Sequence, residues 1–180
     1  SPGTAEADCL AAYLAAIAAV TGCRGLLVAI CRDGRATAPS RGVLGPLAWR
    51  FPVVASEELL AAPGVLAATL ARQLALADQA PDHDLAAAEM ALAGAWQHAR
   101  IAPGALTFRW SSPDTAPPTP RLGSDAKLWR PEDWPSDAEL ALTVTYDQKT
   151  LTLTLDYDAA IVDDALAQGI LARLAECLAA

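Results

Sequence analysis

The residues of this chain that are able to carry chemistry are few and lie far apart. Its two histidines are His83, which stands between Asp82 and Asp84, and His98, on a segment predicted to be helical. Two flanking carboxylates hold a histidine in its charged form, in which it can act as a general acid. The same arrangement is typical of solvated turns. We expect His83 to be a turn residue and His98 to lie on a rim or interface.

Other polar residues have structural explanations. The four cysteines are widely spaced, form no Cys-x-x-Cys pair and are expected to be small buried hydrophobes: Cys9, Cys23, Cys31 and Cys177. Ser111-Ser112 lacks the strand-turn-helix context of a nucleophile. Asp163 and Asp164 precede an apolar helical pattern, where capping explains them. These residue types therefore predict no catalytic or metal site.

The composition is that of a folded, acidic protein. The chain has 180 residues, of which 53% are hydrophobic and 19% charged, and its formal net charge is -8 at pH 7. This fits one globular domain or one half of a larger one. Negative charge is repelled by phosphate backbones and anionic lipids, so we expect neither nucleic acid nor membrane as a partner. With no predicted membrane span and no targeting segment, we expect a cytoplasmic protein.

Hydrophobic periodicity predicts the elements of the first third of the chain. Apolar residues at helical spacing, ended by Thr21-Gly22, predict an amphipathic helix over 5–20. The short apolar run 26–30 between glycines predicts a buried strand, and 47–54 predicts a second one.

The middle of the chain is predicted to be mainly helical. Ser56 is expected to cap a helix, and Pro63-Gly64 to divide this element and leave a second helix over 65–79. A further helix is expected over 84–100. The alternation over 105–110 then predicts a strand.

The last third has the clearest pattern. Alternating apolar residues over 139–157, interrupted at 147–149, predict an antiparallel hairpin, and Asp158 or Asp163 is expected to lead into the closing helix. The proline-rich stretch 111–135 is predicted to be a long loop. The order α-β-β-α-α-β-β-β-α predicts an α/β two-layer sandwich, with helices covering one face of a mixed sheet.

Two stretches carry the pattern of a known family. The first is LAAYLAAIAAVTGCRGLLVAICRDGR followed by GVLGPLAWRFPV, and the second is AELALTVTYDQKTLTLTLDYDAAIVDDALAQGILARLAECLAA. They resemble the carboxy-terminal half of a condensation domain from a nonribosomal peptide synthetase: the first is similar to that family's helix, strand and Gly-Arg turn, and the second to its closing hairpin and last helix. The resemblance covers residues 5–180. It implies that 1–180 is one lobe of a two-lobed fold related to chloramphenicol acetyltransferase.

The same resemblance implies that the reacting groups lie elsewhere. In the family, a His-His-x-x-x-Asp-Gly motif of the other lobe assists attack of an amine on a carrier-bound thioester. His83 and His98 do not form this motif, and Trp49 stands where the family strand has asparagine. We expect no catalytic residue, no metal and no directly bound cofactor. Phosphopantetheine on a partner carrier protein is the cofactor expected nearby.

An interaction surface is expected at five residues. Arg32, Arg35 and Arg41 lie close together in an otherwise acidic chain. They form either a basic rim that meets the phosphopantetheine or the acidic helix of a carrier protein, or an ordinary solvated loop. Trp129 and Trp134 are expected to pin the long loop to the protein body or to a neighbouring domain.

Three functions follow from this reasoning. The first is a noncatalytic, truncated condensation-like domain that acts as a platform for adjacent adenylation or carrier domains. The second is the carboxy-terminal half of an active condensation domain, whose histidine lobe is missing from this chain. The third is a free-standing small-molecule binder that uses the cleft face.

Overall fold

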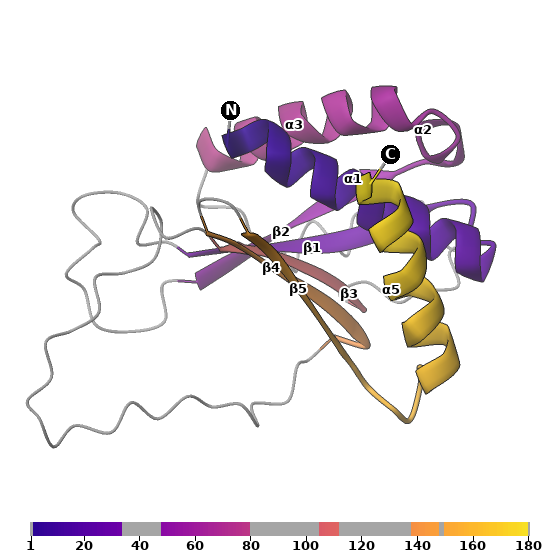
Figure 1. The fold of residues 1–180 in the computed structure, drawn as a ribbon. Helices are drawn as coiled ribbons and strands as arrows, with labels where there is room; N and C mark the ends of the chain where they lie inside the picture. The colour runs from indigo at the N-terminus through magenta and orange to yellow at the C-terminus, as the bar shows by residue number, and fades with distance from the viewer. Residues whose placement is uncertain (1, 34–47, 80–104, 112–137, 148–149, 180) are drawn as a thin grey trace, which may run out of the picture.

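The computed structural model of the protein describes residues 2–33, 48–79, 105–111, 138–147 and 150–179 (Figure 1). The described elements follow the predicted order. They are α1 (Pro2–Thr21), β1 (Leu26–Asp33), β2 (Ala48–Ala55), α2 (Glu57–Leu60), α3 (Pro63–Gln79), β3 (Leu106–Ser111), β4 (Leu140–Asp147), β5 (Thr150–Tyr157) and α5 (Asp164–Ala179). The expected helix at 84–100 and most of the expected loop at 111–135 lie outside the described residues.

The five described strands form one mixed sheet in the order β2-β1-β3-β4-β5. The strands that follow one another closely in sequence, β1 with β2 and β4 with β5, pair antiparallel. β3 pairs parallel with both β1 and β4. Parallel neighbours need long connections, and long segments of the chain do separate these strands. The predicted hairpin is confirmed, with Leu142 opposite Leu155 and Val144 opposite Leu153.

Three of the helices, α1, α3 and α5, lie together on one face of the sheet, as predicted (Figure 1). α1 lies between the other two and packs against both. It is therefore buried around most of its circumference rather than on a single stripe, unlike the amphipathic helix expected. Four of its alanines are buried: Ala7, Ala11, Ala12 and Ala16. Small side chains let neighbouring helices approach closely.

The core between helices and sheet is built from large apolar side chains. Tyr13 of α1 and Phe108 of β3 are fully buried, with ring centroids 6.4 Å apart. The Tyr13 hydroxyl donates to the carbonyl oxygen of Leu140 at 3.5 Å, which gives this buried phenol a partner on β4. Leu66, Leu70 and Leu74 of α3 face the same core.

The helix ends follow local sequence signals. α1 ends at Gly22, whose φ of 70° is left-handed and whose N–H donates to the carbonyl of Ala18. α3 begins at Pro63 itself, two residues earlier than predicted, because proline is well suited to the first helical turn. α5 is capped by Asp163, whose carboxylate accepts from the N–H of Leu166 at 2.7 Å. The Ser56 cap of α2 is confirmed.

Candidate functional site

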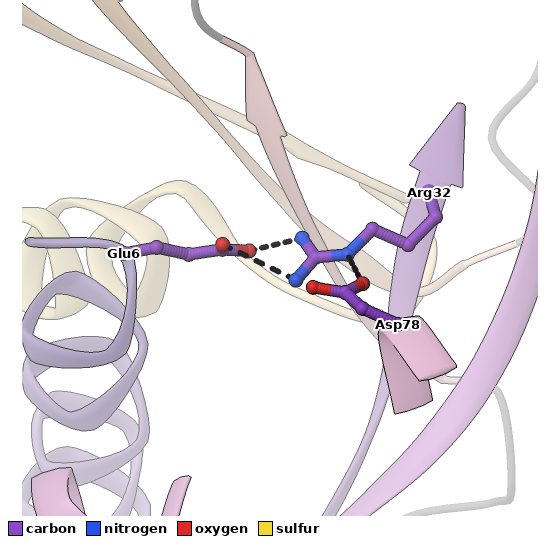
Figure 2. A network of polar contacts seen from close by, with 3 residues as sticks. All are labelled: Glu6, Arg32 and Asp78. Atoms are coloured by element: carbon purple, nitrogen blue, oxygen red, sulfur yellow. Dashed lines mark hydrogen bonds and ion pairs between the residues drawn. The ribbon is translucent and has the colours of Figure 1, made fainter. Parts of the chain in front are cut away.

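A network of three charged side chains joins the helical layer to the end of β1 (Figure 2). Both terminal nitrogens of the Arg32 guanidinium donate to the carboxylate of Glu6 on α1. Its Nε donates to Oδ1 of Asp78 on α3 at 3.0 Å. One guanidinium therefore joins two helices, α1, which ends at Thr21, and α3, which begins at Pro63.

The positions of the three residues follow from the periods of their elements. Successive side chains of a strand alternate between faces, so Arg32 continues the buried positions Val28 and Ile30 of β1. Glu6 lies four residues before the buried Leu10 of α1. Asp78 lies four residues after Leu74 of α3. Each charge thus stands where the apolar pattern of its element would place a core residue.

Burial sets the electrostatics of the network. The side chains of Arg32 and Glu6 are 14% and 10% exposed, whereas that of Asp78 is 55% exposed. Burial raises the pKa of Glu6 above its ordinary value, and the contact with Arg32 acts in the opposite direction. Burial also lowers the pKa of Arg32, but the hydrogen bond and charge of Glu6 outweigh it, so the pKa is raised. Arg32 therefore remains charged.

The geometry of this network suits positioning rather than reaction. Arg32 uses three of its nitrogens on carboxylates, and its guanidinium carbon lies 5.9 Å from the centroid of the Phe51 ring. A bidentate pair of this kind fixes the orientation of both partners. Arg32 is the second-last residue of β1, so the network holds the end of this strand in place. The predicted basic loop follows directly after it in the sequence. Arg32 is a positioning residue.

Other polar side chains lie on the sheet face opposite the helices. Cys31 is paired in register with Arg50 on β2 and with Arg109 on β3. Thr107, two residues before Arg109, is buried, and within the described part of the chain its hydroxyl has no hydrogen-bond partner. Cys31 is a free, buried thiol, which limits its access to reagents.

Of the five residues expected to form the interaction surface, the structure describes only Arg32. Its guanidinium is paired with Glu6 and Asp78. The other four residues of that surface, and both histidines, lie outside the described residues: Arg35, Arg41, Trp129, Trp134, His83 and His98. Their roles stay predictions. Of the cysteines, Cys9 and Cys31 are buried as expected, and Cys23 and Cys177 are half-buried.

Sequence reasoning missed Glu6 and Asp78. The signal that identifies them is a charged residue at a position where the apolar period of a helix predicts burial. Among the described residues no group of three histidine, cysteine, aspartate or glutamate side chains is placed to hold a metal ion. None of the described helices is both long and apolar enough to cross a membrane.

Comparison with known proteins finds similarity at the level of structure. No protein-family model and no curated protein matches the chain. Among solved structures, a condensation domain that mediates chain release from the enacyloxin polyketide synthase matches with a TM-score of 0.58 and 17% identity over 96% of this chain. The described fold is therefore similar to part of a condensation-domain fold. The resemblance found in the sequence is confirmed at this level.

Two further condensation-type structures give the same result. The epimerization domain from the third module of tyrocidine synthetase B matches with a TM-score of 0.57 and 12% identity. The first condensation domain of the calcium-dependent antibiotic synthetase, in complex with a substrate analogue, matches with a TM-score of 0.56 and 15% identity. Both matches cover 96% of this chain. The chain spans only 34% to 40% of the length of the three condensation-type chains.

Proposed function

We propose that this chain is a noncatalytic, truncated condensation-like domain of a nonribosomal peptide synthetase. It acts as a structural or interaction platform for adjacent adenylation or carrier domains. The observation that carries the proposal is the unequal coverage: 96% of this chain aligns with condensation-type domains of which it spans at most 40%. The chain thus supplies one part of a larger fold.

The sequence supports the noncatalytic part of the proposal. Only two histidines are present, His83 and His98, and they are neither adjacent nor followed by Asp-Gly. The histidine motif implied by the resemblance is therefore not contained in these 180 residues. A carrier protein that docks here would bring its own phosphopantetheine, so the proposal needs no cofactor bound by this chain. A cytoplasmic location belongs to the same proposal.

The packing of the described residues supports a platform role. A docking surface needs backbone elements that keep their relative positions when a partner binds. Here α1 packs against both outer helices, and Arg32 pairs with Glu6 of α1 and Asp78 of α3. The pairing ties the helical layer to β1 at one end of the sheet.

Calorimetric titration against the adjacent adenylation and carrier domains tests the proposal. We expect saturable binding to at least one of them, and weaker carrier binding by the double variant Arg35→Glu/Arg41→Glu. The control is Arg72→Glu at an exposed position of α3, which makes the same change of charge at a residue that is not part of the predicted surface. The platform role would be overturned if the chain bound neither the adenylation domain nor the carrier domain.

A second candidate function rests on the same coverage. The chain would be the carboxy-terminal half of an active condensation domain and would contribute channel walls but no base. Mixing it with the matching amino-terminal lobe and assaying amide formation from a carrier-bound acyl donor separates the two functions. Amide formation that requires both parts would replace the noncatalytic proposal with this one.

A further inference from the structure

The two edges of the sheet differ in their protection against pairing with another strand. The edge strand β2 contains Pro52, which has no N–H to donate, and the charged Arg50. Proline and charge are common devices that keep an edge strand from pairing. The other edge strand, β5, has the sequence TLTLTLDY, with neither proline nor lysine and with Asp156 as its one charged residue. Its composition therefore favours strand pairing.

The outer edge of β5 has no partner among the described strands. β5 pairs with β4 on one side and is the last strand of the sheet on the other. Within the described part of the chain, the N–H and C=O groups that point toward that second edge have no strand partner, and a further strand would pair with them. The side chains of Thr152 and Thr154 beside it are exposed. A strand that approaches this edge therefore meets no charged side chain of β5 before Asp156.

An apolar stripe runs beside the same edge on the helical side. Leu153 and Leu155 are only half-buried, and Leu151 is 38% exposed. Although α5 follows β5 in the chain, it packs mainly against α1, so it leaves these leucines partly uncovered. Apolar side chains that remain exposed next to an open strand edge are typical of an interaction site.

We propose that β5 pairs antiparallel with β5 of a second copy of this chain, which joins two five-stranded sheets into one. A twofold axis at Leu153 places Leu151 opposite Leu155 and Thr152 opposite Thr154. Leucines therefore contact leucines on the helical face of the joined sheet, and threonines contact threonines on the opposite face. Cross-strand pairs of like apolar or hydroxyl side chains stabilise strand pairing.

Charge opposes association of two copies over most of the surface, but not within the proposed strand pair. The chain carries a net charge of -8, so two copies repel each other over most of their surfaces. In the proposed register Asp156 lies opposite Thr150, so no acidic side chain directly faces another across the β5 pair. One strand pair is a small interface by the standards of permanent dimers, and we expect a concentration-dependent equilibrium.

Sedimentation velocity of the full chain over a range of concentrations tests the proposal. We expect the average mass to rise from 18.7 kDa toward twice that value as concentration increases. The variant Thr152→Lys/Thr154→Lys places lysine opposite lysine and is expected to raise the dimer dissociation constant about tenfold or more. Thr152→Glu/Thr154→Glu is expected to do the same, whereas an equimolar mixture of the two variants restores the dimer.

The matched control is Ala68→Lys/Ala75→Lys, which adds the same charge at exposed positions of α3 and is expected to leave association unchanged. Circular dichroism shows whether each variant is folded. A chain that stays monomeric at every concentration overturns the proposal, as does a dimer that the β5 variants leave intact. Hydrogen exchange gives a second measurement. If the β5 amides on the edge away from β4 are protected in the dilute monomer, that edge is already paired within one chain and the proposal is overturned.

Discussion

The Arg32 guanidinium forms a bidentate ion pair with Glu6, a residue 26 positions earlier in the chain, inside the layer between helices and sheet (Figure 2). Neither side chain exposes more than 14% of its surface. Removing one member of such a pair leaves the other charge buried and unpaired, which costs much more free energy than the intact pair contributes. The pair is therefore the most sensitive polar contact of the described fold.

Arg32→Met is expected to lower the free energy of unfolding by about 3 kcal/mol at pH 7. Urea denaturation measures this change. The loss is expected to be smaller at pH 5, because burial already raises the pKa of Glu6 and an unpaired Glu6 takes up a proton more readily still. The stability of the variant thus falls as pH rises above the ordinary glutamate range.

Two controls accompany this variant. Arg173→Met removes one partner of the exposed Arg173–Glu176 pair and is expected to change stability far less than Arg32→Met does. The double variant Glu6→Leu/Arg32→Met removes both buried charges and is expected to recover most of the loss. Equal losses in the single and double variants would contradict the unpaired-charge explanation.

Cys9 is expected to resist alkylation in the native protein. Burial first, then the nearby charges of Asp8 and Glu6, raises its pKa from 9.0 to about 11, so the thiol stays protonated at pH 8. Iodoacetamide labelling followed by peptide mass spectrometry should modify the half-buried Cys23 before Cys9. Because the protonated thiol is favoured in the fold, its contribution to stability is present below pH 9.0 and is lost as pH rises through about 11. Equal labelling rates at pH 8 would contradict this prediction.

Thr107→Val is expected to leave stability unchanged or to raise it by about 1 kcal/mol. Within the described residues the Thr107 hydroxyl is buried without a hydrogen-bond partner, and valine has nearly the same shape without the cost of burying a hydroxyl. Thermal unfolding followed by circular dichroism measures the effect. A loss of about 1 kcal/mol or more would mean that this hydroxyl does form a hydrogen bond in solution.

Gly22→Ala and Gly64→Ala are expected to act in opposite directions. Gly22 has a φ of 70° at the end of α1, so a side chain there costs about 1 kcal/mol. Gly64 lies in the first turn of α3, and a Cβ added to it meets nothing within 4 Å, so alanine is expected to stabilise by up to about 1 kcal/mol. Chemical denaturation of both variants measures the two changes in the free energy of unfolding. A stabilising Gly22→Ala would disagree with the left-handed conformation.

Local signals in the sequence determined the elements and many of their ends. The alternation over 139–157 predicts β4 and β5, Thr21-Gly22 predicts the end of α1, and Asp163 was one of two residues expected to begin the last helix. These features depend on a few neighbouring residues, whose periodicity and capping groups act over a single turn or strand. The order of these elements predicts the α/β sandwich, and the resemblance to condensation domains implies that it is one lobe of a two-lobed fold.

Only the tertiary structure decided which distant residues meet. The parallel pairing of β3 with β1 and β4 places Arg109 beside Cys31, and the packing of α1 between two helices brings Glu6 to Arg32 and Asp78. The sequence groups Arg32 with Arg35 and Arg41, in a basic rim or a solvated loop, because the three arginines lie close together in an acidic chain. The actual environment of Arg32 comes from residues 26 and 46 positions away. Such contacts depend on how all the apolar faces pack at once, and no local pattern records that arrangement.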